Sequence, residues 1–152
     1  MKLIEYTSEE LCLADLRVPD KESCLDRMCA RLEEAGRLKE RSTLHRALLE
    51  REKVESTGIG GGIALPHARC EDFDGHAVAI AHLAEPIDYG APDGRPVDLV
   101  FLLAGSSRRP GQQLRVLARI STLVRIDSFL AELRAASTPE AMCRALRKAE
   151  GL

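Results

Sequence analysis

The sequence predicts an α/β (α+β) fold, a single three-layer domain with a mixed β-sheet flanked by helices on both faces. Residues 97–104 are nearly all apolar, which is typical of a central strand covered on both sides. Strand-like segments occupy the middle of the chain, and amphipathic helical patterns precede and follow them. The 152 residues suit one compact unit, so we expect one domain over 1–152.

The first third of the chain predicts one strand and two helices. Residues 12–18 form a short apolar segment suited to a strand. Asp20 can cap a helix over 21–35, which Gly36 ends. A second helix is expected over 42–53, and in both helices apolar residues recur every three or four positions. The residues expected on the inner faces of these helices are Leu25, Met28, Leu32, Ala35, Leu44, Ala47 and Leu48.

Three strands are expected in the middle of the chain. The glycine-rich residues 57–62 predict a loop that leads into a short strand ending near His67, because the preceding proline excludes a helix. Further strands are expected over 76–83 and 97–104, and Asp93-Gly94 between them is a turn signal.

Three helices are expected after the last strand. The first spans 111–125, and the second spans 127–136 with Asp127 as its cap. The third spans 139–149, with Thr138 as its cap and a proline at its first position, where proline is tolerated. The residues expected on the inner face of the first of these helices are Leu114, Leu117, Ile120 and Val124.

Composition and charge argue against several classes of protein. The formal net charge is -2, whereas proteins that bind nucleic acid through bulk charge are basic, so we expect no nucleic-acid partner. No run of about 18 apolar residues is present, and the N-terminus lacks the apolar core of a signal peptide. We therefore expect no membrane insertion and a cytoplasmic protein. Five cysteines without paired spacing indicate reduced thiols, and no cluster of ligands indicates a metal or another cofactor.

The glycine-rich loop beside His67 is the segment most informative about chemistry. It lacks the Gly-Lys-Ser/Thr of a phosphate-binding P-loop, and no helix follows the glycines as a dinucleotide fingerprint requires. Successive backbone amides in glycine turns can bind an anion, and neutral imidazole is a nucleophile near neutral pH. The residues themselves leave two interpretations open: a transient phosphohistidine, or a structural glycine hairpin with a histidine at a strand end.

A longer motif around this loop resembles that of a known family, the enzyme IIA proteins of the mannitol, fructose and nitrogen-regulatory phosphotransferase type. The residues that carry the resemblance are Arg51-Glu52, Ser56-Thr57-Gly58-Ile59-Gly60 and Gly62-Ile63-Ala64-Leu65-Pro66-His67, and downstream Glu85-Pro86-Ile87, Asp93 and Pro96-Val97-Asp98-Leu99. The resemblance covers nearly the whole chain. In length, the chain looks most like the stand-alone nitrogen-regulatory branch.

The resemblance implies roles for individual residues. His67 would accept a phosphoryl group from a histidine phosphocarrier protein, and the guanidinium of Arg51 would bind that group. The residues that would complete the phosphate-binding site are Ser56, Thr57, Gly58, Gly60 and Gln113. For Arg51 the alternative is a solvated helix end, and for the two hydroxyls it is a structural part in the turn.

Gln113 is a departure from the family pattern. The family usually has a second active-site histidine at the start of the helix after the central strand, and aligning Leu114 and Leu117 with the family's leucines places Gln113 there. Glutamine can donate a hydrogen bond to phosphate but cannot move a proton. This favours a phosphorylatable regulator with a protein target over a sugar-specific IIA that passes phosphate to a IIB domain. A third alternative is a binding module that keeps the fold without phosphorylation.

The remaining histidines are expected to be structural. His82 lies on the strand face of Val78 and Ile80, so we expect a hydrogen-bonded core residue. His45 and His76 are expected at the surface.

Overall fold

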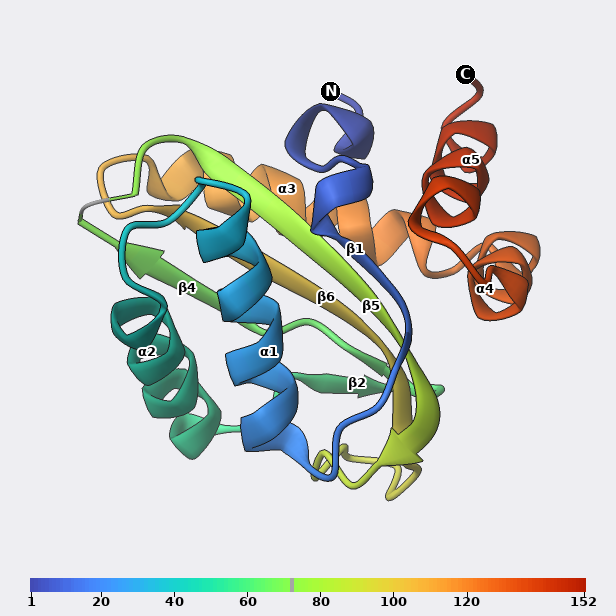
Figure 1. Ribbon diagram of the computed structural model, residues 1–152, viewed down its shortest axis with the longest axis horizontal. Helices are drawn as coiled ribbons and strands as arrows, with labels where there is room; N and C mark the ends of the chain where they lie inside the picture. Colours follow the sequence, from blue (N-terminus) through green and yellow to red (C-terminus); the bar gives the residue numbers. More distant parts are fainter. Residues whose placement is uncertain (72) are drawn as a thin grey trace.

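A mixed β-sheet forms the middle layer of the protein (Figure 1). The computed structural model describes residues 1–71 and 73–152, and this part of the chain contains one six-stranded sheet. The strands are β1 (Cys12–Leu16), β2 (Gly58–Gly60), β3 (Ile63–Ala64), β4 (His67–Cys70), β5 (His76–Ile87) and β6 (Val97–Ser106). Their order is β1-β5-β6-β3-β2, with β4 also paired to β6. The predicted mixed sheet is confirmed, because β5–β6 and β2–β3 are antiparallel pairs and the other pairs are parallel.

The central strand is β6, as its apolar sequence predicts. Every residue of this strand except Asp98 is buried, because helices cover both faces of the sheet. Strands β5 and β6 continue past their predicted ends, to Ile87 and Ser106. The two strands pair along most of their length and form the long antiparallel pair of the sheet.

Strands β3 and β4 pair one after the other with β6, in the same register. The paired residues are Ile63 with Leu99, Ala64 with Val100, His67 with Leu103, and Ala68 with Ala104. The sequence separation is the same in all four pairs, so the register survives the break at Pro66, whose carbonyl accepts from the Leu103 amide at 2.9 Å. The prediction that the strand ends near His67 is therefore wrong: His67 begins β4, and the strand continues to Cys70.

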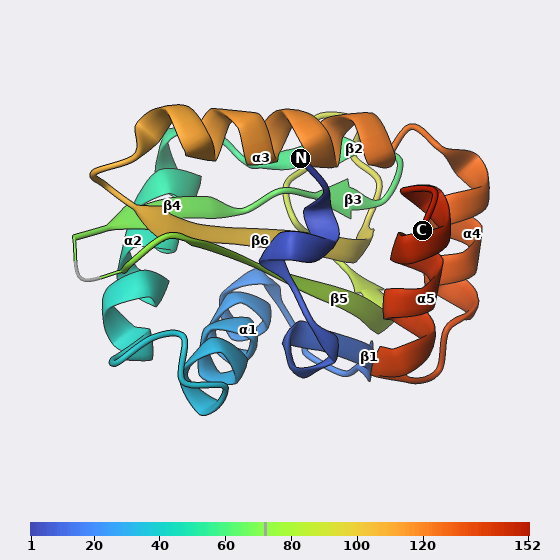
Figure 2. The ribbon, with the colours of Figure 1, turned by 90° about the horizontal axis from the view of Figure 1, so that it is seen from above.

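Helices cover the sheet in two outer layers (Figure 2). The helices are α1 (Lys21–Glu34), α2 (Arg41–Val54), α3 (Pro110–Leu123), α4 (Asp127–Ala135) and α5 (Pro139–Ala149), with short 3-10 turns at Leu3–Tyr6 and Glu9–Leu11. One apolar core lies between the sheet and α1 and α2, and a second lies between the sheet and α3, α4 and α5. The three-layer prediction is thus confirmed. No helix in the described ranges is long and apolar enough to cross a bilayer.

Most of the predicted helix starts are confirmed. The Asp20 carboxylate accepts from the Ser23 amide at 2.8 Å, and the Thr138 hydroxyl accepts from the Ala141 amide at 3.1 Å. Asp127 is not a cap, because it is the first residue of α4 and no side-chain bond caps that helix. Its charge still lies at the helix N-terminus, where an acidic residue is favourable.

The predicted inner face of α3 is confirmed at Ile120 and Val124, which are buried, and wrong at Leu114. Its buried residues are Gln113, Val116, Ile120 and Leu123, whereas the Leu114 side chain is 68% exposed. Leu117 packs against the core only in part. Both sets of residues recur every three or four positions, so periodicity alone does not choose between them.

The prediction for His76 is wrong, and those for His45 and His82 hold only in part. His76 is buried, not at the surface, because β5 pairs it with Gly105 of β6 and it lies inside the sheet. His45 is half-buried, with Nε2 3.2 Å from the Glu22 carbonyl oxygen. His82 is also half-buried, but its Nδ1 lies 3.6 Å from the Asp15 carboxylate, too far for the predicted hydrogen bond.

The cysteines all belong to the protein interior. Cys24, Cys29 and Cys70 lie in the core beside α1 and α2. Cys12 and Cys143 lie on the other side of the sheet, with their sulfur atoms 3.8 Å apart. Burial raises the pKa of the Cys24 and Cys29 thiols to about 12, so both stay protonated at neutral pH.

Candidate functional site

A cleft opens where the start of β4 meets helices α2 and α3. Its volume is about 490 Å³. The residues that line it are Ala47, Arg51, His67, Ala68, Arg69, Pro110, Gln113, Leu114 and Leu117. Two of them carry a permanent charge, Arg51 and Arg69, and both are positive. The cleft therefore favours an anion.

His67 lines this cleft, and one of its ring nitrogens is bound by the backbone. Its Nδ1 lies 2.8 Å from the carbonyl oxygen of Leu65, in the bend that joins β3 to β4. A carbonyl oxygen can only accept, so Nδ1 carries the hydrogen of the neutral ring. The lone pair is then on Nε2, and the backbone bond fixes the orientation of the imidazole. This arrangement gives His67 a nucleophilic nitrogen.

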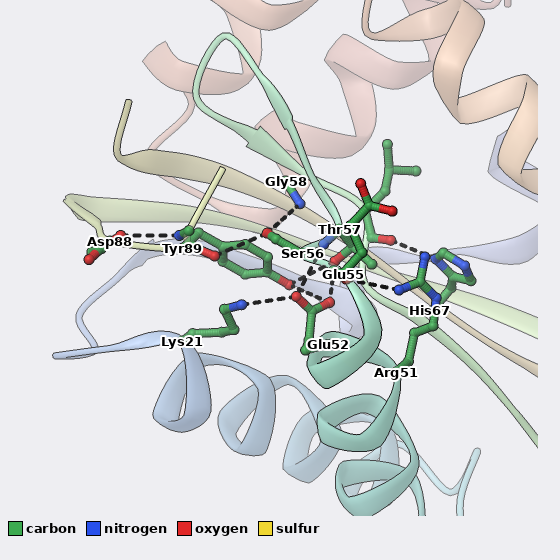
Figure 3. A network of polar contacts seen from close by, with 12 residues as sticks. Lys21, Arg51, Glu52, Glu55, Ser56, Thr57, Gly58, His67, Asp88 and Tyr89 are labelled. Carbon is green, nitrogen blue, oxygen red and sulfur yellow. Dashed lines mark hydrogen bonds and ion pairs between the residues drawn. The ribbon is translucent and has the colours of Figure 1, made fainter. Parts of the chain in front are cut away.

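Arg51 lies beside His67, at the last turn of α2 (Figure 3). Its Nη1 donates to the carbonyl oxygen of Glu55 at 2.9 Å, which anchors the guanidinium and leaves its other N–H groups available. Arg69 follows His67 by two residues in β4, so both side chains lie on the same side of the strand. Sequence reasoning missed Arg69, because the strand was expected to end before it.

Gln113 closes the cleft from the first turn of α3. Its side chain is 5% exposed and lines the same cleft as His67. The predicted proximity of His67, Arg51 and Gln113 is therefore seen in the structure.

Ser56 and Thr57, predicted to bind phosphate, instead belong to a polar network on the other side of the α2 C-terminus (Figure 3). The Ser56 hydroxyl donates to the Tyr89 carbonyl at 3.1 Å and accepts from the Gly58 amide at 3.1 Å. The Thr57 hydroxyl donates to the Glu52 carboxylate and lies 3.1 Å from the Tyr89 hydroxyl. None of these residues lines the cleft. Both hydroxyls thus shape the turn.

Glu52 is the centre of this network. Its carboxylate lies 3.0 Å from Lys21 Nζ, and it accepts from the Thr57 amide at 3.1 Å and from the Tyr89 hydroxyl at 3.3 Å. Burial and the nearby Glu52 carboxylate raise the pKa of Tyr89, so the phenol stays neutral. These contacts fix the C-terminal end of α2, the helix that carries Arg51.

The glycine loop forms a tight hairpin between β2 and β3 and does not line the cleft. Gly60 and Gly61 have positive φ values of 93° and 66°, which glycine adopts readily. The Gly61 amide donates to the Asp93 carboxylate at 2.9 Å, and backbone amides, that of Gly61 foremost, lower the pKa of Asp93. The anion held at this loop is therefore a carboxylate of the protein. Gly58 and Gly60, which were predicted to bind phosphate, do not line the cleft that contains His67.

Metal-ligating residues are dispersed in the described part of the chain. Within residues 1–71 and 73–152, no three His, Cys, Asp or Glu side chains come together in a group that could hold a metal ion.

Comparison with known proteins identifies the family of this fold and cleft. A family model described as the phosphoenolpyruvate-dependent sugar phosphotransferase system, EIIA 2, matches residues 5–149. The chain belongs to this EIIA family. It is a phosphoryl-carrier domain of the IIA type, related both to nitrogen-regulatory and to sugar-specific members.

Two curated relatives show both branches of the EIIA family. The chain is 34% identical over 142 residues to a nitrogen regulatory protein of Bradyrhizobium diazoefficiens, and the match covers 93% of this chain and 92% of that protein. It is 33% identical over 142 residues to the fructose-specific EIIABC component of Bacillus subtilis. This second match covers 93% of the chain but only 22% of that longer protein.

Solved structures of EIIA proteins share the fold. The nitrogen regulatory protein IIA-Ntr of Neisseria meningitidis is 29% identical, with a TM-score of 0.86 over 93% of this chain and 97% of that one. The complex of the mannitol enzyme IIA with phosphorylated enzyme IIB from Escherichia coli matches with a TM-score of 0.78 at 18% identity, over 93% of this chain and 96% of that chain. At that identity the second match concerns the fold, and it records a IIA protein bound to a IIB partner.

Proposed function

We propose that this protein carries a phosphoryl group on Nε2 of His67, received from a histidine phosphocarrier protein. The observation that supports the proposal is the hydrogen bond from Nδ1 to the Leu65 carbonyl, which leaves Nε2 as the nucleophilic nitrogen. That nitrogen belongs to a cleft whose charged lining is arginine. A phosphoryl group needs such positive charge and such a fixed nucleophile.

The proposed step is an in-line displacement at phosphorus. The Nε2 lone pair of His67 forms a bond to phosphorus, and the bond from phosphorus to the donor's imidazole nitrogen breaks with its electron pair on the donor. The hydrogen stays on Nδ1, which donates it to the Leu65 carbonyl throughout. The protein contributes position and charge stabilisation, as is usual for phosphoryl transfer.

Arg51 and Arg69 would bind the non-bridging oxygens of the phosphoryl group. Guanidinium groups match phosphate geometry and stay charged at any physiological pH. Arg51 is already anchored by the Glu55 carbonyl, so its ordering costs less on binding. Gln113 would supply a neutral hydrogen-bond donor from the first turn of α3.

Intact mass measurement during phosphorylation tests the proposal. The protein is mixed with phosphoenolpyruvate, enzyme I and a histidine phosphocarrier protein, with His67→Ala as the control. We expect an acid-labile gain of about 80 Da, one phosphoryl group, which the control lacks. No gain with a competent cognate donor would contradict the proposal and would favour a binding module that keeps only the fold.

The output of the phosphorylated form is proposed to be regulatory. The nitrogen regulatory relative matches over nearly its whole length, and Gln113 cannot move a proton as a histidine can. We therefore expect phosphorylation to change which protein target binds, through the added charge. The sugar-specific alternative predicts rapid transfer from phosphorylated protein to a IIB domain. Following the loss of mass after addition of a fructose or mannitol IIB domain distinguishes the two outputs.

The proposed setting is the cytoplasm. All five cysteines lie in the interior, and the pKa of Cys24 and Cys29 is raised to about 12, so these groups suit a reducing compartment in which thiols persist. Fractionation of cells that express the full protein, followed by immunodetection, tests this location.

A further inference from the structure

A pair of buried polar side chains lies beneath the cleft, on the side away from solvent. His76 of β5 is 4% exposed and Gln113 of α3 is 5% exposed. Within the described residues, both ring nitrogens of His76 and the Oε1 atom of Gln113 are buried and have no hydrogen-bond partner. Buried polar atoms are nearly always paired, so three such atoms on two side chains call for an explanation.

The two side chains meet above Gly105 of β6. A Cβ atom at Gly105 would come closer than 3.0 Å to Nε2 of His76 and to Oε1 of Gln113. Both atoms therefore lie close to the position that a Cβ atom of residue 105 would occupy. Because glycine has no side chain, this space is left to the two polar groups. A small rotation about the side-chain bonds, or a single bridging water, joins them.

The chemistry of the two groups is complementary. Burial lowers the pKa of His76; the Gln112 side chain offsets part of this effect, and the positive charge of Arg109 lowers the pKa further. The ring is therefore neutral near pH 7 and carries one N–H donor. The Oε1 atom of Gln113 is an acceptor only. A donor and an acceptor that both lack partners therefore face the same small space.

The orientation of the Gln113 carboxamide matters for the cleft. A phosphoryl group bears only acceptor oxygens, so it is stabilised by the amide NH2 end and repelled by the carbonyl end. The two ends have almost the same shape, and packing alone does not distinguish them. A hydrogen bond at the inner end decides which end faces the cleft.

We propose that His76 is a positioning residue for phosphoryl transfer: its Nε2–H holds Oε1 of Gln113 and so directs the Gln113 NH2 group toward the phosphoryl group on His67. This inference rests on the proposed function of His67. It makes His76 and Gln113 one functional unit drawn from a strand and a helix. Gly105 belongs to the unit because any side chain there would displace both partners.

A double-mutant cycle tests the coupling between the two residues. His76→Phe removes the N–H but keeps a planar ring, and we expect transfer to His67 to slow by about tenfold, as for a lost hydrogen bond to a charged group. In the Gln113→Leu background the same change should have almost no further effect. His76→Gln, which restores an N–H donor, should recover most of the rate.

The matched control is His82→Phe, the same substitution in the same strand at a half-buried histidine that does not line the cleft. It should leave the transfer rate per folded molecule unchanged. Equal slowing by His76→Phe with and without Gln113, or no slowing at all, would overturn the inference.

Nitrogen NMR of the unphosphorylated protein provides a readout that does not need phosphoryl transfer. We expect His76 to be neutral with its hydrogen on Nε2, and the Gln113 NH2 resonances to shift in the His76→Phe variant. A hydrogen on Nδ1 with unchanged Gln113 resonances would contradict the pairing. Failure of wild-type protein to accept a phosphoryl group would instead contradict the proposed function, and the NMR result would still decide whether His76 holds Gln113.

Discussion

Replacement of Thr57 by valine tests whether this hydroxyl serves the turn or the phosphoryl group. The side chain is 5% exposed, its hydroxyl donates to the Glu52 carboxylate, and the Tyr89 hydroxyl lies 3.1 Å away. Valine has the same shape without the hydroxyl, so the change removes these hydrogen bonds and leaves the packing intact. We expect a loss of stability without a loss of transfer activity.

The expected size of the loss follows from what Glu52 retains. A hydrogen bond to a charged group contributes roughly 1.5–3 kcal/mol. After the change, Glu52 still has Lys21 at 3.0 Å, the backbone amide of residue 57 at 3.1 Å and the Tyr89 hydroxyl at 3.3 Å. The carboxylate is therefore not left unpaired, and we expect a decrease of about 2 kcal/mol in the free energy of unfolding.

Urea denaturation of wild-type protein and Thr57→Val, with transfer rates measured under native conditions, provides the assay. Thr122→Val is the matched control, because Thr122 is exposed and its hydroxyl donates only to the Ala118 carbonyl of its own helix. The control should change stability by less than about 0.5 kcal/mol. Unchanged stability together with slower transfer in Thr57→Val would refute the structural role and return this hydroxyl to the phosphate site.

Three further predictions concern other parts of the molecule. Glu150→Ala should lower the free energy of unfolding in urea by about 3–5 kcal/mol. The reason is that this buried carboxylate accepts from the amides of residues 3 and 4 and pairs with Arg119 at 2.8 Å. The control Glu140→Ala, at an exposed position, should change it little. Leu114→Glu should leave stability within about 0.5 kcal/mol but slow phosphorylation at low concentrations of the protein donor, since this exposed side chain borders the cleft. His76 should make stability depend on pH. Because burial lowers its pKa in the folded state, the unfolded chain binds the proton more readily, so stability is full above the ordinary pKa of 6.5 and decreases as pH falls below it. We expect the free energy of unfolding, measured with urea between pH 7.5 and pH 5, to depend less steeply on pH in His76→Phe than in the wild-type protein. An equal dependence on pH in the two proteins would contradict this assignment.

Local signals in the sequence were sufficient for most of the fold. Helix caps such as Asp20 and Thr138 act over three residues, and the apolar run of β6 reports burial on both faces, so neither depends on distant contacts. The continuation of the strand past Pro66 could not be predicted in the same way. It depends on a carbonyl that accepts from Leu103, and a single sequence does not specify that strand pairing.

The candidate site was predictable in part for a similar reason. His67 and Arg51 follow from the motif, and the cleft contains both. The glycine loop was expected to bind an anion, which its positive φ values permit. Its anion is the Asp93 carboxylate, 32 residues beyond Gly61, and only the three-dimensional structure shows that this carboxylate occupies the loop.

The wrong prediction for Leu114 and the shape of the cleft have the same origin. Gln113 and Leu114 are adjacent, so their side chains point about 100° apart around the helix. A helix that buried Leu114 would turn Gln113 away from the floor of the cleft. The observed orientation instead places the polar residue next to His76 and Gly105 and leaves Leu114 exposed at the rim. Apolar periodicity fails in this first turn because it supplies both a polar floor for the proposed phosphoryl group and an exposed apolar edge, and local rules are most often broken where a site is built.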